Sequence, residues 1–537
     1  MRVARQSNRL REVTLHAPMG SVNTISAGAA MPPEDCIYRY NMMPGEYGLR
    51  TRLGSREWCT GLDGEPRSLL PFTGSTKDGA SNKLFACTRT GIWDVTSSSA
   101  APTKVHTFAV QSNDSGWGTS IVTTTSAGHF LLYCDEENGY HVMPQGGAWA
   151  KIAQGGGAGE ITGTDGAFTI DPGNLAFVME WKHRVYFVEK DSGRGWYLPT
   201  NAIYGTAKPH HFGNHFKGGG DLRGLWSWTG DGGAGIDDNL VVVSGGGDVL
   251  VYQGTDPETA GAFRLQGVYF AGQVPAGRRF CTDSGGDLLL MSSLGILPIA
   301  KLVTGTLIYD RTQYPSYKIG NLFNQLQATT ASLRGWAMAI HPQENTLVAL
   351  VPTAPATASQ QLVMGLSSGS WSVYRDMPMG VCAVPYGGRL YFGTPDGRVC
   401  TAEGDVDGVT LADPTASTPI AWSLLTGVSN LGNPRQKRVQ VIRPTFLASA
   451  TVAYEVAARY RWDLSDIPSI AAVAPDPNAW GTAVWDTAVW APEYSPTQRV
   501  SGATGIGPEV AIAIRGTSSV RTILVSMDVA YDQGGLL

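Results

Sequence analysis

The sequence predicts an all-β protein built around a β-propeller of six or seven blades. Glycine accounts for 67 of the 537 residues, and the chain carries 15 tryptophans and 20 tyrosines. Many glycine turns between aromatic-rich segments are typical of short antiparallel strands. In addition, one strand–turn–strand pattern returns seven times between residues 83 and 400. These observations favour a ring of small sheets over a helical protein or a single sandwich.

The repeated pattern is that of a β-hairpin. Asn138-Gly139 and Asp396-Gly397 supply the positive φ angles that primed hairpin turns need. Successive copies begin 47, 54, 55 and 48 residues apart, close to the ~40–50-residue period of propeller blades, and the last two steps of 74 and 28 residues break this period. The copies are Lys83–Val95, Phe130–Met143, Arg184–Leu198, Asn239–Tyr252, Asp287–Leu297, Gln361–Tyr374 and Arg389–Cys400.

We expect three parts: an extended N-terminal arm over residues 1–60, the propeller with insertions over 61–410, and a C-terminal β-sandwich over 411–537. The arm has little periodicity, so we expect it to gain structure by lying on other parts. The C-terminal part has longer alternating strands. Its apolar stripes, each on one face of a strand, are Val452, Tyr454 and Val456; Val510, Ile512 and Ile514; and Ile523, Val525, Met527, Val529 and Tyr531.

One helical pattern interrupts the strands. After Pro315, apolar residues recur at Ile319, Leu322, Phe323 and Leu326, which is the spacing of one face of a helix. We therefore predict a short amphipathic helix that serves packing or an interface.

Charge and targeting signals restrict the function. With 40 Lys+Arg against 45 Asp+Glu, the formal charge of −5 excludes a generally basic nucleic-acid binder but permits a local basic patch. No apolar run suggests a secretory signal or a membrane span. The seven cysteines are scattered without a CxxC pair, which favours folding in a reducing cytoplasm.

No motif of a familiar catalytic class is present, so we predict neither an enzyme nor a cofactor. The weak metal candidates are the histidine group His210, His211 and His215, and the acidic loop with Glu403, Asp405 and Asp407. The histidines lack a nearby Glu or Cys, and Pro414 stands where a calcium loop needs its closing Glu. A third weak match is Ser112–Gly116, which matches the first half of the turn repeated in sialidase propellers. For this loop and the acidic one, ordinary Asx-type turns are the better explanation.

Three stretches carry a resemblance to a known family. Gly20–Arg56 contains a Pro-Pro-Glu … Gly-Leu-Arg-x-Arg-x-Gly progression, and Ala421–Thr445 reads as strand, loop and basic strand. The third stretch repeats tryptophan at a spacing of five, at Trp480, Trp485 and Trp490. Together they resemble tail nozzle or hub proteins of short-tailed bacteriophages, the group that includes the packaged-DNA stabilisation and tubular tail proteins.

The resemblance implies a structural virion protein, assembled in the bacterial cytoplasm as a ring of, commonly, six copies. Such a ring lies below the portal and its adaptor, extends the channel for double-stranded DNA, retains the packaged DNA and anchors fibres or spikes. Basic residues could contact these partners or DNA phosphates, although solvated strand edges and tails are an equal explanation. The candidate contacts are Arg2, Arg5, Arg9, Arg11, Arg435, Lys437, Arg438 and Arg443.

A carbohydrate-binding or glycoside-hydrolysing β-propeller is the alternative. The abundant aromatic residues could form platforms on which sugars stack, with Trp226 and Trp228 as the first candidates. The partial Ser112–Gly116 turn points the same way, whereas the missing secretory signal argues against it.

Overall fold

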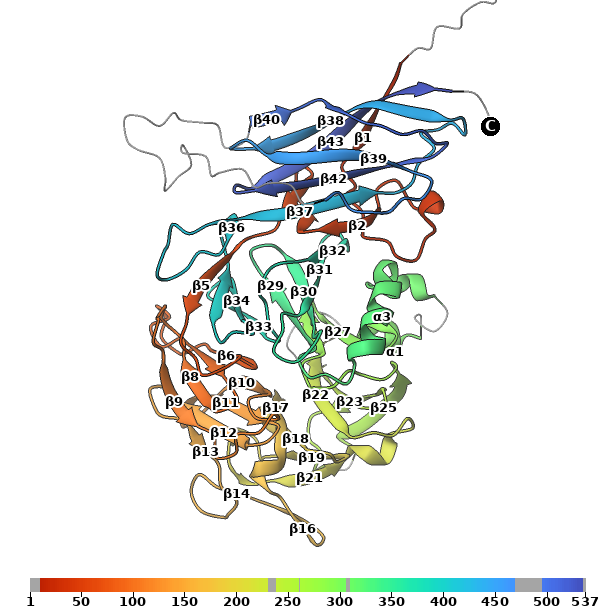
Figure 1. Ribbon diagram of the computed structural model, residues 1–537. Coiled ribbons are helices and arrows are strands. Elements are labelled where there is room, and N and C mark those ends of the chain that lie inside the picture. Colours follow the sequence, from red (N-terminus) through yellow and green to blue (C-terminus); the bar gives the residue numbers. More distant parts are fainter. Residues whose placement is uncertain (1–9, 230–237, 260, 306–309, 469–494, 535–537) are drawn as a thin grey trace, which may run out of the picture.

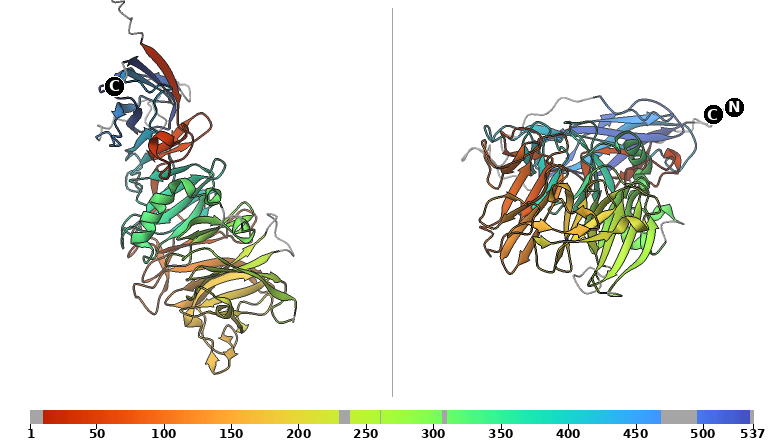
Figure 2. Two further views of the ribbon diagram at one scale, coloured as in Figure 1. Left: turned by 90° about the vertical axis from the view of Figure 1, so that its right-hand side faces the viewer. Right: turned by 90° about the horizontal axis from the view of Figure 1, so that it is seen from below.

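The computed structural model describes residues 10–229, 238–259, 261–305, 310–468 and 495–534 (Figure 1). These residues form strands almost throughout. Helical segments within them are α1 (Ile299–Val303), α3 (Gly320–Thr330) and the short turns η1 (Gly28–Ala30), η2 (Pro172–Asn174), η3 (Phe212–His215), η4 (Arg311–Gln313) and η5 (Tyr317–Ile319). The molecule is elongated, with a ring of small sheets at one end and two larger sheets at the other (Figure 2).

Six small sheets lie in a ring, the arrangement of a β-propeller, which confirms the predicted fold class. Each is an antiparallel meander of three or four strands, and we call each sheet a blade and name it by its first strand in the ring. The blades are β6–β9 (Ser68–Phe72, Lys83–Cys87, Gly91–Asp94, Thr103–Thr107), β10–β13 (Gly118–Thr125, Gly128–Asp135, Gly139–Pro144, Ala150–Lys151), β17-β18-β19-β21 (Leu175–Trp181, Arg184–Glu189, Arg194–Tyr197, Lys208–His211), β22–β25 (Leu222–Trp228, Asn239–Ser244, Asp248–Gly254, Phe263–Phe270), β26–β28 (Cys281–Ser284, Asp287–Ser292, Gly295–Pro298) and β33-β34-β35-β5 (Ala383–Tyr386, Arg389–Gly393, Val399–Ala402, Ser55–Cys59).

A further meander fills the gap in this ring between β26 and β33. It consists of β29 (Ala337–His341), β30 (Thr346–Val351), β31 (Gln360–Gly365) and β32 (Trp371–Tyr374). Its first strand, β29, contacts both β26 and β33. Its last strand joins a larger sheet, so this meander belongs to the ring and to the other end of the molecule at once.

The predicted hairpins are observed, and they explain the broken period. Six of the seven form the second and third strands of a blade, whereas Gln361–Tyr374 forms the third and fourth strands of the β29–β32 meander. Counted from Thr346, where the equivalent second strand begins, the last two steps become 59 and 43 residues. The spacing is irregular because the hairpin recognised in this meander is formed by its third and fourth strands, whereas the others are formed by second and third strands. The architecture itself does not change.

The other end of the molecule is a sandwich of two sheets. One sheet contains β1 (Arg11–His16), β3 (Met42–Pro44), β4 (Leu49–Thr51), β38 (Lys437–Ala448), β40 (Ser495–Gln498), β41 (Ser501–Gly502) and β43 (Thr522–Gln533). The other continues from β32 through β2 (Cys36–Tyr40), β37 (Thr418–Thr426) and β42 (Val510–Ser518) to β39 (Ala453–Tyr460), with β36 (Val406–Asp407) beside β37. The short strands β14 (Ile161–Thr162), β15 (Thr164–Asp165), β16 (Phe168–Thr169) and β20 (Gly205–Thr206) extend below the ring.

The predicted apolar stripes account for the core of this sandwich. Val452 directly before β39, Tyr454 in β39, and Val510, Ile512 and Ile514 in β42 are buried in a single cluster between the sheets. In β43 the stripe is interrupted, because the pairing with β38 shifts its register between Ser526 and Leu524. The shift leaves Val525 half-buried and turns Leu524 into the core, where it joins Met527, Val529 and Tyr531.

The segment before residue 60 is extended, as expected, but its described part forms strands of three sheets. β2 lies between β32 and β37, β4 pairs with β43, and β5 pairs with β35 as the outer strand of a blade. Cys36, Met42 and Leu49 are fully buried. These residues are therefore an integral part of both ends of the molecule.

The predicted helix is confirmed as α3. Phe323 is buried in the main core, Leu322 and Leu326 pack against it, and Ile319 lies buried one residue before the helix begins. No helix in the described ranges is long and apolar enough to cross a membrane.

Candidate functional site

The first strands of the blades begin together at one mouth of the central channel. Contacts place these strands in the order β6, β10, β17, β22, β26, β29 and β33 around the ring, so β26 and β29 lie across the channel from β10. The segments that precede them carry Arg67, Arg278, Arg279 and Arg334. We call this end of the channel the arginine mouth.

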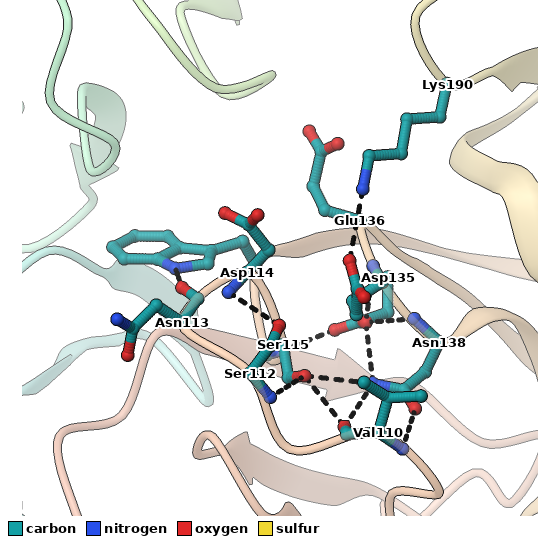
Figure 3. Close-up of polar contacts among 12 residues, drawn as sticks. Val110, Ser112, Asn113, Asp114, Ser115, Asp135, Glu136, Asn138 and Lys190 are labelled. Carbon is teal, nitrogen blue, oxygen red and sulfur yellow. Dashed lines mark hydrogen bonds and ion pairs between the residues drawn. The ribbon is translucent and has the colours of Figure 1, made fainter.

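The Ser112–Gly116 turn lies directly before β10 at the arginine mouth, and Figure 3 shows its polar contacts with Val110 and Asn138. The Ser115 hydroxyl donates to the Val110 carbonyl at 2.8 Å, and the Asn138 side-chain amide donates to the same carbonyl at 3.0 Å. Arg67 then donates from Nη1 to the carbonyls of Ser112, Asn113 and Ser115 at 3.4, 3.1 and 2.7 Å. The turn that partly matches the sialidase motif is thus held by its own side chains and by a neighbouring blade.

Three ion pairs cross the channel end to reach the β10 blade and the turn before it. Arg278 Nε lies 2.7 Å from Glu136 Oε1, and both side chains are buried, with 4% and 5% of their surface exposed. Arg334 lies 3.1 Å from Glu136 and 3.1 Å from Asp114. Burial opposes the charge of Glu136, but the two arginines hold the pKa of this carboxyl below its usual value. The network ties opposite sides of the ring together across this end of the channel.

Trp117 is held between two guanidinium groups. Arg67 lies 5.5 Å and Arg279 lies 5.8 Å from the centre of its ring, and its indole N–H donates to the Asn113 carbonyl at 3.1 Å. Arg279 also donates from Nη2 to the Val381 carbonyl at 3.3 Å, on the segment before β33. Burial lowers the pKa of Arg279, yet the structure gives it no carboxylate partner among the described residues.

Glu65 is the second unusual group of the mouth. Its Oε1 atom is buried and has no hydrogen-bond partner in the described part of the chain. Burial raises the pKa of Glu65 to about 7, and the charge of Arg67 offsets part of this effect. The carboxyl is therefore partly protonated near neutral pH.

Behind the mouth lies a central cavity of about 960 Å³. Arg278 and Arg279 line it near the arginine mouth, and Glu180, Ser227 and Asp283 line it toward the ends of the first strands. At the far end its lining includes residues that are exposed to solvent: Pro342, Pro385, Gly387 and Gly388.

The predicted histidine group does not converge on one point. His210 packs against Phe212 and Phe263, with ring centres 4.3 and 5.4 Å away, and burial lowers its pKa to about 4. His211 contacts Asp165, and His215 lies edge-on to Tyr252. Among the described residues, no group of three His, Cys, Asp or Glu side chains could hold a metal ion.

The acidic loop that partly resembles a calcium site also disperses its carboxylates. Glu403 pairs with Arg389 at 2.9 Å, and Asp407 pairs with the buried Arg52 at 2.6 Å. Burial raises the pKa of Asp405, which disfavours its charged form. Glu403 and Asp407 therefore serve two separate ion pairs.

The predicted basic contacts have different environments. Lys437 is fully buried, and its ammonium group donates to the carbonyls of Asn433, Arg435 and Pro508. It holds the loop before β38 and faces no partner, which corrects the prediction for this residue. Sequence alone could not separate Lys437 from its neighbour Arg438, because alternation along the strand sends one inward and the other outward.

The remaining described cations lie on the surface of the sandwich. Arg11, Arg435, Arg438 and Arg443 are exposed. Arg443 pairs with Asp528 at 2.8 Å, and Thr14 donates to the same carboxylate at 2.7 Å. The predicted contacts Arg2, Arg5 and Arg9 lie outside the described residues, as do Trp480, Trp485 and Trp490.

Trp226, the first of the two residues predicted for sugar stacking, lines the central cavity and also contacts other aromatic rings. Phe177 and Phe280 each meet Trp226 edge-to-face, with ring centres 5.3 Å apart. Trp228 packs partly buried against the main core.

Sequence reasoning missed Arg278 and Arg279. The one sequence signal that could have identified them is that two arginines stand side by side directly before the first strand of a blade.

No protein-family model matches the chain, and no curated protein matches it. Among solved structures, the chain is similar to a computationally designed protein, Ika8, at 11% identity over 65% of this chain and 99% of that chain, with a TM-score of 0.32. This similarity is too weak to carry an argument about function.

Proposed function

We propose that the protein is a non-enzymatic structural subunit of a phage tail nozzle or hub ring. In this role several copies, commonly six, form a ring below the portal and adaptor. The ring extends the DNA channel, retains the packaged DNA and anchors fibres or spikes. The observation that carries the proposal is the sandwich end of the elongated molecule, where the first strand β1 and the last strand β43 lie side by side (Figure 1).

The outer face of this sandwich fits a protein partner. Arg443 and Asp528 pair across β38 and β43, and Arg438 lies opposite Asp532, so both signs of charge are interspersed on the face. A surface of mixed charge favours one relative alignment with a protein surface of complementary charge. A surface that contacts DNA phosphates would instead be mainly basic. We therefore assign this face to subunit or adaptor contacts.

The interior of the molecule fits a load-bearing role. Cross-channel ion pairs tie the blades together, and the β29–β32 meander is shared between ring and sandwich. A subunit built in this way transmits force between its ends without a flexible linker. The proposal also assigns the protein to the virion, after assembly in the host cytoplasm.

A docking experiment tests the assignment of the sandwich face. Head–adaptor particles are mixed with the full-length protein and sedimented, and the bound protein is measured. The double variant Arg438→Glu, Arg443→Glu should lose binding at least tenfold, because it reverses two charges of the face. The matched control is Arg264→Glu on the outer blade strand β25, which should bind as the wild type does. Equal binding by the double variant would remove the sandwich face from the proposal.

A further inference from the structure

The central cavity of the ring is crossed by ion pairs at one end and lined by solvent-exposed residues at the other. The ion pairs of Arg278 and Arg334 cross the arginine mouth, and the opposite end includes solvent-exposed residues such as Gly387 and Gly388. Its volume of about 960 Å³ lies within the range of small-molecule sites, which is ~300–1,000 Å³. The channel is therefore a pocket with an arginine-rich base.

Arg67 and Arg279 are the arginines of this base without a carboxylate partner among the described residues, and Arg279 has the fewer hydrogen-bond acceptors of the two. Arg278 and Arg334 have carboxylate partners, and Arg67 donates to three carbonyls of one turn. In the described part of the chain, Arg279 has one carbonyl acceptor, Val381, and one aromatic neighbour, Trp117. A guanidinium carries five N–H donors, so most of its donors remain for a ligand.

The position of Arg279 is fixed before any ligand binds. Trp117 is held by its hydrogen bond to Asn113 and by Arg67 on its ring, and Arg279 rests against the same indole. A guanidinium held in this way loses little side-chain freedom on binding and presents a planar fork. That fork matches the two oxygens of a carboxylate.

The walls of the pocket suit a ligand with hydroxyl groups. The blade strands β6, β10, β17, β22, β26 and β33 are each terminal in their sheets, so their channel-facing edges have no strand partner. Such edges present backbone N–H and C=O groups alternately, and sugar hydroxyls can both donate to and accept from them. The acidic residues Glu180 and Asp283 also line the cavity, which disfavours a ligand with two negative charges.

We propose that this pocket binds a small sugar carrying one carboxylate, with Arg279 as the group that receives the carboxylate. This goes beyond the proposed structural role and does not depend on it. The sugar body lies along the strand edges, and its acid group reaches the base of the channel.

Calorimetric titration of the full-length protein tests the proposal with three matched probes. Glucuronate should bind, whereas glucose, which has a hydroxymethyl group in place of the carboxylate, should bind at least tenfold more weakly. The third probe is glucose 6-phosphate, which carries two negative charges in a cavity lined by the acidic residues Glu180 and Asp283 and should therefore bind more weakly than glucuronate. Equal affinity for glucuronate and glucose, or absence of glucuronate binding, would overturn the proposal. Equal affinity for glucose 6-phosphate would overturn the assignment to a carboxylate.

Variants of Arg279 test whether this residue receives the carboxylate of glucuronate. Arg279→Gln should weaken glucuronate binding by about 10- to 100-fold, since a charge-assisted hydrogen bond is lost. Arg279→Lys keeps the charge but loses the fork, so it should fall between wild type and Arg279→Gln. Arg264→Gln removes an arginine from the outer strand β25 and should leave binding unchanged. Thermal unfolding identifies any variant that does not fold, and in that case the three-probe comparison on the wild type still decides. Unchanged binding by a folded Arg279→Gln would contradict the role of Arg279.

Discussion

At the scale of single residues, the charged side chains fall into two groups with different energetic roles. Arg278 is buried and donates to Glu136 and to the carbonyls of Leu222 and Arg223, so its removal leaves several groups without partners. Arg443 makes an ion pair with Asp528 on a solvent-exposed face, where water screens the attraction. The same residue type therefore contributes very differently to stability at these two positions.

The substitution Arg278→Leu should lower the free energy of unfolding by about 3 kcal/mol, because a buried carboxylate loses its nearer partner. The control Arg443→Leu removes an exposed ion pair and should cost about 1 kcal/mol or less. Denaturant unfolding followed by circular dichroism measures both. Similar losses for the two variants would mean that the cross-channel pair does not hold the ring together.

The raised pKa of Glu65 should make stability depend on pH. Its folded-state pKa of about 7 lies above the ordinary value of 4.5, so the protonated form is favoured by folding. The contribution is fully present below pH 4.5 and is lost as the pH rises through 7. Glu65→Gln should therefore lose less stability than the wild type between pH 4.5 and 7.5, as measured by unfolding at each pH. Parallel pH profiles for the two proteins would contradict the buried environment of Glu65.

At the scale of strands and sheets, local sequence signals predicted the hairpins. They could not predict which strands pair when those strands lie far apart in the sequence. Turn chemistry at Asn138-Gly139 and Asp396-Gly397 is set by neighbouring residues, and the predicted strands are present there. By contrast, β5 pairs with β35, although Arg56 and its partner Thr401 lie far apart in the sequence. Nothing in the local pattern of Ser55–Cys59 identifies such a partner, so this segment was assigned to an arm.

The same limit applied to the candidate site. Arg278 and its partner Glu136 are 142 residues apart, and Arg279 and Val381 are 102 residues apart. A sequence shows charged residues next to strands but does not show which of them meet across a ring. The histidine and acidic groups, which are close in sequence, were visible for that reason, and the structure disperses them.

Two truncations separate the roles of the N-terminal residues. Deletion of residues 1–9 keeps every described strand and should leave circular dichroism and thermal unfolding unchanged. Deletion of residues 1–60 removes β1 to β5, including the buried residues Cys36 and Met42, and should abolish cooperative unfolding. A folded, cooperative product of the longer deletion would contradict the integration of this segment. If the N-terminal arginines contact the adaptor, the shorter deletion should also reduce docking.

At the scale of the whole molecule, the account rests on an elongated subunit with its ring of blades at one end and both ends of the described chain in the sandwich at the other (Figures 1 and 2). Its nearly balanced charge, −5 over 537 residues, allows many copies to pack side by side without strong repulsion. Side-by-side packing around a closed axis produces a ring with a central channel.

Electron microscopy of the purified full-length protein, with and without head–adaptor particles, tests this account most directly. The account predicts closed rings with a central channel, commonly of six copies, either free or docked with the sandwich end toward the adaptor. Single elongated particles that neither close into rings nor dock on the adaptor would contradict it.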